Sequence, residues 1–111
     1  MTGFEETREG WVGVVTRHPR RGREIEAFGG AARFRGRTVL DVGTGDGRLA
    51  LDIARYARRV VGVDPGEDAI EEARRAAKAL GRRNTEFRVG SAQDLDAVRE
   101  RFDIAIFSWS L

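Results

Sequence analysis

Short apolar runs alternate along residues 37–111 with longer stretches whose apolar side chains recur at helical spacing. Four runs predict strands, over residues 38–42, 60–63, 85–89 and 102–107. Three longer stretches predict helices, over residues 46–57, 65–80 and 94–101. The run 85–89 alternates apolar and polar residues more than the others, so we expect that strand nearer a sheet edge. Strands that alternate with helices in this way indicate βαβ units.

The predicted fold class is therefore α/β, with a doubly wound parallel sheet of about four strands over residues 37–111. Right-handed crossovers would place helices on both faces, and a ligand would bind beyond the carboxyl ends of the strands, where the strand order reverses. Residues 1–36 hold seven of the fourteen glycines, and we expect an irregular N-terminal extension that folds over the domain. A helix over residues 21–32 is weakened by Gly29 and Gly30.

The amino-acid composition limits the kinds of functional site that the chain can form. The 111 residues are enough for one domain and contain no cysteine and a single histidine, His18, so we expect no disulfide and no metal site. The net charge is +2, almost all of the basic charge being arginine. No secretory signal and no membrane-length apolar run is present, so we expect a cytoplasmic protein that does not bind membranes. The basic run 17–23 could contact nucleic acid, but a solvated loop is favoured because no aromatic residues interleave.

Three glycines follow the first predicted strand at alternate positions, in the sequence Gly43-Thr44-Gly45-Asp46-Gly47. Glycine lets a ligand approach the backbone, and free N–H groups at the start of the next helix would be donors. A tight turn would require glycine at one or two of these positions, so three favour a ligand. No Gly-Lys-Ser or Gly-Lys-Thr follows, which excludes a P-loop, and Arg48 stands where a dinucleotide loop has its third glycine.

Two aspartates accompany this loop. Asp64 ends the second predicted strand and could accept both ribose hydroxyls of an adenosine in charge-assisted bonds. It could also be the N-cap of the helix behind Pro65, and the two roles can coexist. Asp41 lies inside an apolar strand, where a carboxylate is costly unless it is hydrogen-bonded. It would bond either to nearby loop amides or to the amino group of a ligand, directly or through water.

The stretch Val39-Leu40-Asp41-Val42-Gly43-Thr44-Gly45-Asp46-Gly47 resembles the first motif of the class I S-adenosylmethionine-dependent methyltransferases. Residues 60–64 resemble their second strand with its ribose-binding acid, residues 90–95 the loop that brackets the adenine, and residues 102–108 the fourth strand. The resemblance covers about residues 37–108. It implies a Rossmann-like fold, S-adenosylmethionine as cofactor and methyl transfer as activity.

The resemblance also implies roles for the loop and the two aspartates. The loop 43–45 would pack against the methionine and ribose part of the cofactor, and Asp41 would orient the methionine amino group. Asp64, with Pro65 beside it, would hold the ribose.

At the other strand ends, Ser91 would approach the adenine amino group, the Ala92 N–H its ring nitrogen, and Ser108 the sulfonium. Family members often carry an acid in place of Ser91, and a hydroxyl would accept that bond less strongly. Ser108-Trp109-Ser110-Leu111 looks more like the small-molecule branch than the Asn/Asp-Pro-Pro-Tyr of amino-methylating enzymes. We therefore expect a small-molecule acceptor, while no residue stands out as the general base.

The family sheet continues past the fourth strand, whereas this sequence ends at Leu111. The strand 102–107 would then lie at a sheet edge, which proteins usually avoid. We expect that the chain is a fragment, that it forms a homodimer through this edge, or that residues 1–36 cover the edge. Two other functions stay open: a non-catalytic S-adenosylmethionine-binding or interaction module, and a nicotinamide-dependent oxidoreductase, which Arg48 and the loop 90–95 disfavour.

Overall fold

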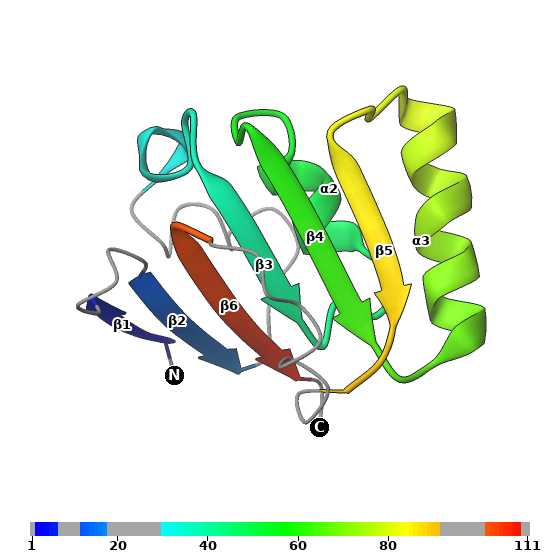
Figure 1. Cartoon of the computed structure of the whole chain (residues 1–111), viewed down its shortest axis with the longest axis horizontal. Helices are drawn as coiled ribbons and strands as arrows, with labels where there is room; N and C mark the ends of the chain where they lie inside the picture. Colours follow the sequence, from blue (N-terminus) through cyan, green and yellow to red (C-terminus); the bar gives the residue numbers. More distant parts are fainter. Residues whose placement is uncertain (1, 7–11, 18–29, 92–101, 110–111) are drawn as a thin grey trace.

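The computed structural model describes residues 2–6, 12–17, 30–91 and 102–109, with the side chains of residues 30–91 and 102–107. These residues form a six-stranded sheet in the order β1-β2-β6-β3-β4-β5 (Figure 1). The strands are β1 (Thr2–Glu6), β2 (Val12–Arg17), β3 (Thr38–Val42), β4 (Arg59–Asp64), β5 (Thr85–Val89) and β6 (Ile104–Trp109). β1 is antiparallel to β2, and the other neighbouring strands are parallel.

The four predicted strands are β3, β4, β5 and β6, and the predicted α/β class with a parallel sheet is confirmed. β3 and β5 have the predicted bounds, and β5 lies at the sheet edge. β6 begins two residues later than predicted. Asp103, just before β6, is held by Thr38: its carboxylate accepts the Thr38 N–H at 2.9 Å and the Thr38 hydroxyl at 3.2 Å. This contact joins the amino ends of β3 and β6.

Residues 1–36 contribute two strands, so the expectation that this segment is irregular was wrong for β1 and β2. β2 runs parallel to β6, with Val12 opposite Ile104 and Arg17 opposite Trp109. Cover by the N-terminal residues is therefore the arrangement found for the apolar β6 strand. β6 has β2 on one side and β3 on the other, so the edge that the expected homodimer would use is occupied.

The strand order reverses at β3. The chain passes from β3 to β4 and β5 on one side and returns with β6 on the other side of β3. The carboxyl ends of β3 and β6 thus form the switch point at which open α/β sheets bind ligands. The glycine loop 43–47 leaves β3 at this point, at the lower side of the sheet in Figure 1.

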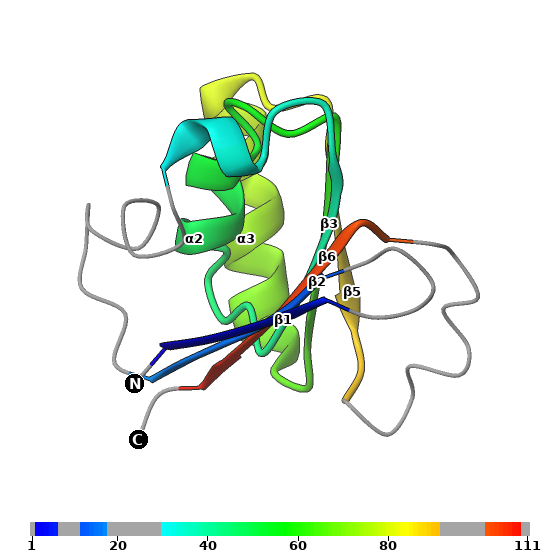
Figure 2. The same ribbon diagram turned by 90° about the vertical axis from the view of Figure 1, so that its left-hand side faces the viewer.

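The described helices, α2 (Arg48–Ile53), α3 (Glu67–Leu80) and the short 3-10 helix η1 (Ala31–Arg33), all lie on one face of the sheet (Figure 2). α3 begins two residues later than predicted and ends at the predicted Leu80, where Gly81 follows in the left-handed conformation. α2 is shorter than predicted at both ends. The helix predicted over residues 94–101, and residues 21–29 of the helix predicted near the N-terminus, lie outside the described residues.

Both faces of the central strands are buried. The cluster between sheet and helices includes Phe34, Val39, Ile53, Val60, Ile70, Phe87 and Ile106. The cluster on the opposite face comprises Leu40, Val42, Val61, Val63, Phe102 and Ala105. Burial on two faces is the reason that β3, β4 and β6 read as nearly continuous apolar runs. In the described part of the chain, no helix is long and apolar enough to span a membrane.

Candidate functional site

The glycine loop has the same unusual backbone at all three of its glycines. Gly43, Gly45 and Gly47 have φ angles of 80°, 58° and 79°, a left-handed region that costs a residue with a Cβ about 1–2 kcal/mol. The turn itself therefore requires glycine at each position. Our inference that a turn would explain only one or two of the glycines was wrong, and the case for a ligand has to come from other groups.

Gly47 is also a packing position. A Cβ on Gly47 would lie 2.8 Å from the Ala73 Cβ and 2.8 Å from the Phe87 ring, closer than side chains approach one another. The start of α2 is thus pressed between α3 and β5. In dinucleotide loops a glycine one position later permits this close helix–strand contact. Here Gly47 does so, which explains why Arg48, exposed at the surface, is tolerated at the next position.

Most amides of the loop are already used inside the protein. The N–H groups of Gly43 and Thr44 both donate to the Val63 carbonyl, at 2.8 and 3.0 Å, and the Gly45 N–H donates to Asp64 Oδ2 at 2.9 Å. The Gly47 N–H donates to the Thr44 carbonyl at 2.9 Å. The expected free donors at the helix start are therefore not found at these four positions. This loop is poorly equipped to hold a pyrophosphate, which dinucleotide-binding loops bind through such amides.

Asp64 connects the loops that follow β3 and β4. Its Oδ2 accepts the Gly45 N–H, and its Oδ1 accepts the Gly66 N–H at 2.8 Å. The N-cap of α3 is Gly66, so Asp64 is not the N-cap. A carboxylate has about four lone-pair sites, so two are left for hydroxyl donors of a ligand. The side chain is only partly buried at the carboxyl end of β4, where a ligand can reach it.

Two polar residues near the end of β3 are buried, Asp41 in the strand and Thr44 in the loop. Asp41 is fully buried in β3, opposite Gly62 of β4 and Ile106 of β6. Thr44 is 7% exposed, and among the described residues its hydroxyl has no hydrogen-bond partner. The Thr44 hydroxyl oxygen lies 2.8 Å from the place that a Cβ on Gly62 would take. A buried hydroxyl of this kind calls for a further polar partner, such as water or a ligand group.

Gly62 was not predicted as a site residue, although a glycine in the middle of an apolar strand is a usable signal. A Cβ there would lie 2.7 Å from the Phe87 ring as well as 2.8 Å from the Thr44 hydroxyl. Gly62 therefore makes room for both side chains below the loop. It is needed for the site without offering a functional group of its own.

The other expected site residues lie at neighbouring strand ends. Ser91 is half-buried and directly follows Gly90, whose N–H donates to the Asp64 carbonyl at 2.9 Å. Pro65 is exposed beside Asp64. The backbone of Ser108 lies at the carboxyl end of β6, opposite Thr16 of β2. The side chain of Ser108 and the whole of Ala92 lie outside the described part.

The candidate site contains two carboxylates, and few amides of its glycine loop are free to bind a ligand. Asp41 and Asp64 both lie near the carboxyl ends of strands beside the switch point. Most amides of the loop between them donate to acceptors within the protein. Such a site suits a ligand with hydroxyl and amino donors and repels phosphate. Across the described residues, no three His, Cys, Asp or Glu side chains are grouped so that they could hold a metal ion.

Comparison with known proteins defines the class. Residues 34–111 match the family described as "Methyltransferase domain". The match covers more than half of the chain, and the chain therefore belongs to the methyltransferase domain family.

Two relatives show how the match is distributed. The chain is 38% identical over 90 residues to a ubiquinone biosynthesis O-methyltransferase of Rhizobium etli. This alignment covers 78% of this chain and 36% of that protein. It is 45% identical over 58 residues to an uncharacterized RNA methyltransferase of Enterococcus faecalis. This second alignment covers 52% of this chain and 13% of that protein. The chain thus spans about a third of the first relative's length and much less of the second.

Solved structures agree with the fold. The YcgJ protein of Bacillus subtilis superimposes with a TM-score of 0.66 at 32% identity, over 78% of this chain and 36% of that one. PKMT2 of Rickettsia typhi, solved in complex with AdoHcy, has a TM-score of 0.58 at 28% identity, over 64% of this chain and 14% of that one. The Rossmann-like fold expected from the sequence is confirmed.

Proposed function

We propose that this chain is the cofactor-binding part of an S-adenosylmethionine-dependent methyltransferase. The observation that carries the proposal is the pairing of Asp64 with the glycine loop at the switch point of the sheet, where most loop amides are already bonded and are not offered to a pyrophosphate. A dinucleotide would bring two phosphates toward two aspartates. S-adenosylmethionine brings no phosphate, and it carries a sulfonium, an amino group and ribose hydroxyls. This favours it over the nicotinamide alternative.

The residues described above fit the groups of this cofactor. Asp64, held from two sides by the Gly45 and Gly66 amides, would accept the ribose hydroxyls in charge-assisted bonds. Gly45 has no atom within 4 Å of the place of a Cβ, so the backbone there is open to a ligand. Asp41 would attract the methionine amino group. Thr44 would satisfy its buried hydroxyl through a water in the same region.

The cofactor supplies a methyl group that is already activated on a sulfonium. The protein then has to position the cofactor and exclude water, and it gains rate chiefly through proximity and orientation. Asp64 contributes by fixing the ribose through a side chain that is itself fixed by two hydrogen bonds. Pro65, Ser91, Ala92 and Ser108 complete the proposed binding set at the neighbouring strand ends. No residue is proposed as general base.

We propose a small molecule as the methyl acceptor. Support comes from the end of β6, which lacks the Asn/Asp-Pro-Pro-Tyr pattern of amino-methylating enzymes, and from the ubiquinone biosynthesis O-methyltransferase relative, which covers 78% of this chain. The RNA methyltransferase relative covers only 52%. The acceptor site itself would require parts of the whole protein that this chain does not span, because the chain covers about a third of that O-methyltransferase.

Calorimetric titration tests the cofactor directly. We expect S-adenosylmethionine and S-adenosylhomocysteine to bind the folded chain, and NADH to leave it unaffected. Binding of S-adenosylhomocysteine but not of NADH would also rule out the oxidoreductase. Binding of NADH alone would contradict the proposal. If a longer protein that contains this chain binds the cofactor but transfers no methyl group, the non-catalytic alternative is correct.

A further inference from the structure

Two polar side chains lie in an otherwise apolar interior. In the described part of the chain, the buried polar or charged residues are Asp41 and Thr44, at 0% and 7% exposure. Burial of a polar group is costly unless the group is bonded, and a fold tolerates such a cost chiefly at functional sites. Both residues lie where β3 meets the glycine loop, at the proposed cofactor site. Their shared location indicates that the Thr44 hydroxyl has a role toward the ligand.

Gly62 makes the space that the Thr44 hydroxyl occupies. Asp41 of β3, Gly62 of β4 and Phe87 of β5 are aligned in register, so they form one row on the helix-covered face of the sheet. A Cβ on Gly62 would lie 2.8 Å from the Thr44 hydroxyl oxygen and 2.7 Å from the Phe87 ring. Neighbouring strands are about 4.8 Å apart, so the Thr44 hydroxyl and the Asp41 carboxylate border the same space.

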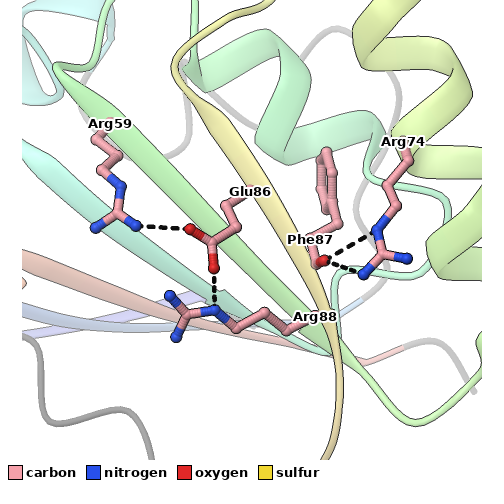
Figure 3. A network of polar contacts seen from close by, with 5 residues as sticks. All are labelled: Arg59, Arg74, Glu86, Phe87 and Arg88. Atoms are coloured by element: carbon pink, nitrogen blue, oxygen red, sulfur yellow. Dashed lines mark hydrogen bonds and ion pairs between the residues drawn. The ribbon is translucent and has the colours of Figure 1, made fainter.

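The Phe87 side of this space is apolar and fixed. Arg74 of α3 donates to the Phe87 carbonyl through Nε at 3.2 Å and through Nη2 at 2.8 Å, as Figure 3 shows. The ring itself is buried, and an aromatic ring is at most a weak acceptor. A partner for the Thr44 hydroxyl therefore has to come from the side of Asp41 or from a ligand.

The order of the strands indicates which part of the cofactor lies at Thr44. β4, which ends at Asp64, has β3 on one side and β5 on the other. A ribose at Asp64 thus leaves one end of the cofactor toward Ser91, after β5, and the other end toward Thr44, after β3. With the adenine at Ser91, the end at Thr44 is the amino-acid part. Of the two charged groups of that part, the Asp41 carboxylate attracts the amino group and repels the carboxylate.

We propose that the Thr44 hydroxyl selects ligands that carry an amino-acid part. One water would donate to the Asp41 carboxylate and accept from the Thr44 hydroxyl and from the amino group of the ligand. Three hydrogen bonds are typical of a buried water. Because Asp41 is fully buried, such a bridge lets a ligand at the loop use its charge. The inference rests on the proposed function and deepens it, because it makes Thr44 a determinant of ligand choice.

Calorimetric titration with two ligands tests this inference. S-adenosylhomocysteine carries the amino-acid part, and methylthioadenosine has the adenine, the ribose and the sulfur without it. Thr44→Val keeps the shape of the side chain and removes the hydroxyl. The dissociation constant of S-adenosylhomocysteine should rise about tenfold, as for one lost hydrogen bond, and that of methylthioadenosine should stay within about twofold. Thr44→Ser keeps the hydroxyl and should bind S-adenosylhomocysteine within about threefold of the wild type.

Thr38→Val is the matched control. It is the same substitution at the other end of β3, where the Thr38 hydroxyl donates to Asp103 Oδ2 at 3.2 Å and accepts the Asp103 N–H at 3.1 Å. Loss of these bonds should lower the Tm by about 4–8 °C without a change in the preference for S-adenosylhomocysteine. Thr44→Val should keep its Tm within about 2 °C of the wild type, because the Thr44 hydroxyl has no partner among the described residues.

Three results would overturn the inference: equal weakening of both ligands by Thr44→Val, unchanged binding of both, or no recovery of binding in Thr44→Ser. Thr44→Ala removes the hydroxyl together with the methyl group, and it repeats the comparison if Thr44→Val does not fold. A wild type that binds neither ligand would refute the proposed function and this inference together. A wild type that binds both, with no change of preference in Thr44→Val, would refute the inference alone.

Discussion

Replacement of Gly47 by alanine should destabilise the protein more than replacement of Gly45, in the same loop, by alanine. Two effects act together at this position. The φ angle of 79° is unfavourable for alanine by about 1–2 kcal/mol. The added Cβ would also lie 2.8 Å from the Ala73 Cβ and from the Phe87 ring, and overpacking of this kind costs about 1–3 kcal/mol. The expected loss is about 2–5 kcal/mol.

Two other glycines separate these effects. Gly81 has a φ angle of 68° and Gly45 one of 58°, and neither would have any atom within 4 Å of an added Cβ. Gly81→Ala and Gly45→Ala should therefore show the backbone cost alone, about 1–2 kcal/mol. The difference from Gly47→Ala isolates the contact between α2, α3 and β5.

Urea denaturation followed by circular dichroism measures all three variants. With m-values of about 1–3 kcal/mol per molar urea, the packing term corresponds to a difference in midpoint on the order of 1 M. If Gly47→Ala and Gly81→Ala lose the same stability, the close packing at Gly47 is not real, and the explanation given for the displaced third glycine fails with it.

Asp103→Ala removes the acceptor of the Thr38 N–H and hydroxyl. The free energy of unfolding should fall by about 1–3 kcal/mol. A loss below about 0.5 kcal/mol would show that this contact does not join β3 to β6. Hydrogen bonds from Arg88 and Arg59 lower the pKa of Glu86 below its ordinary value of 4.5, the Arg88 bond being the largest cause. Stability from Glu86 is then present above that value and lost as pH falls below it. Wild type should exceed Glu86→Gln near pH 6 by under about 1 kcal/mol, because the side chain is 43% exposed, and the difference should shrink toward about pH 3; a difference that grows instead would contradict the sign.

The central part of the fold could be predicted because its strands are buried on both faces. Residues 38–42 and 85–89 are strands with the predicted bounds, and α3 runs to the predicted Leu80. β1 was missed because Phe4 is its one apolar residue, and β2 because Gly13 interrupts its apolar run; what makes them strands is pairing with each other and, for β2, with β6. Tertiary pairing of this kind leaves no periodic signal in a single sequence.

The site was predicted in outline and corrected in detail. Asp64 and the glycine loop do lie together, but the hydrogen bond between the Asp64 carboxylate and the Gly45 amide could not be read from their spacing. The left-handed φ angles at Gly43, Gly45 and Gly47 likewise depend on the way the loop folds back over Val63. The expectation that failed concerns the loop amides: we expected them to be free donors for a ligand, and most of them donate within the protein.

Binding of S-adenosylmethionine to Asp64→Asn tests the central claim most directly. Asparagine keeps the size of the side chain and loses its charge, and the exposed Asp68 in the first turn of α3 gives a matched control, Asp68→Asn. If Asp64 holds the ribose, the dissociation constant should rise by about 10–100-fold in Asp64→Asn, the equivalent of about 1.5–3 kcal/mol for hydrogen bonds to a charged group. Asp68→Asn should bind as the wild type does. Unchanged affinity in a folded Asp64→Asn variant would contradict the account of this site.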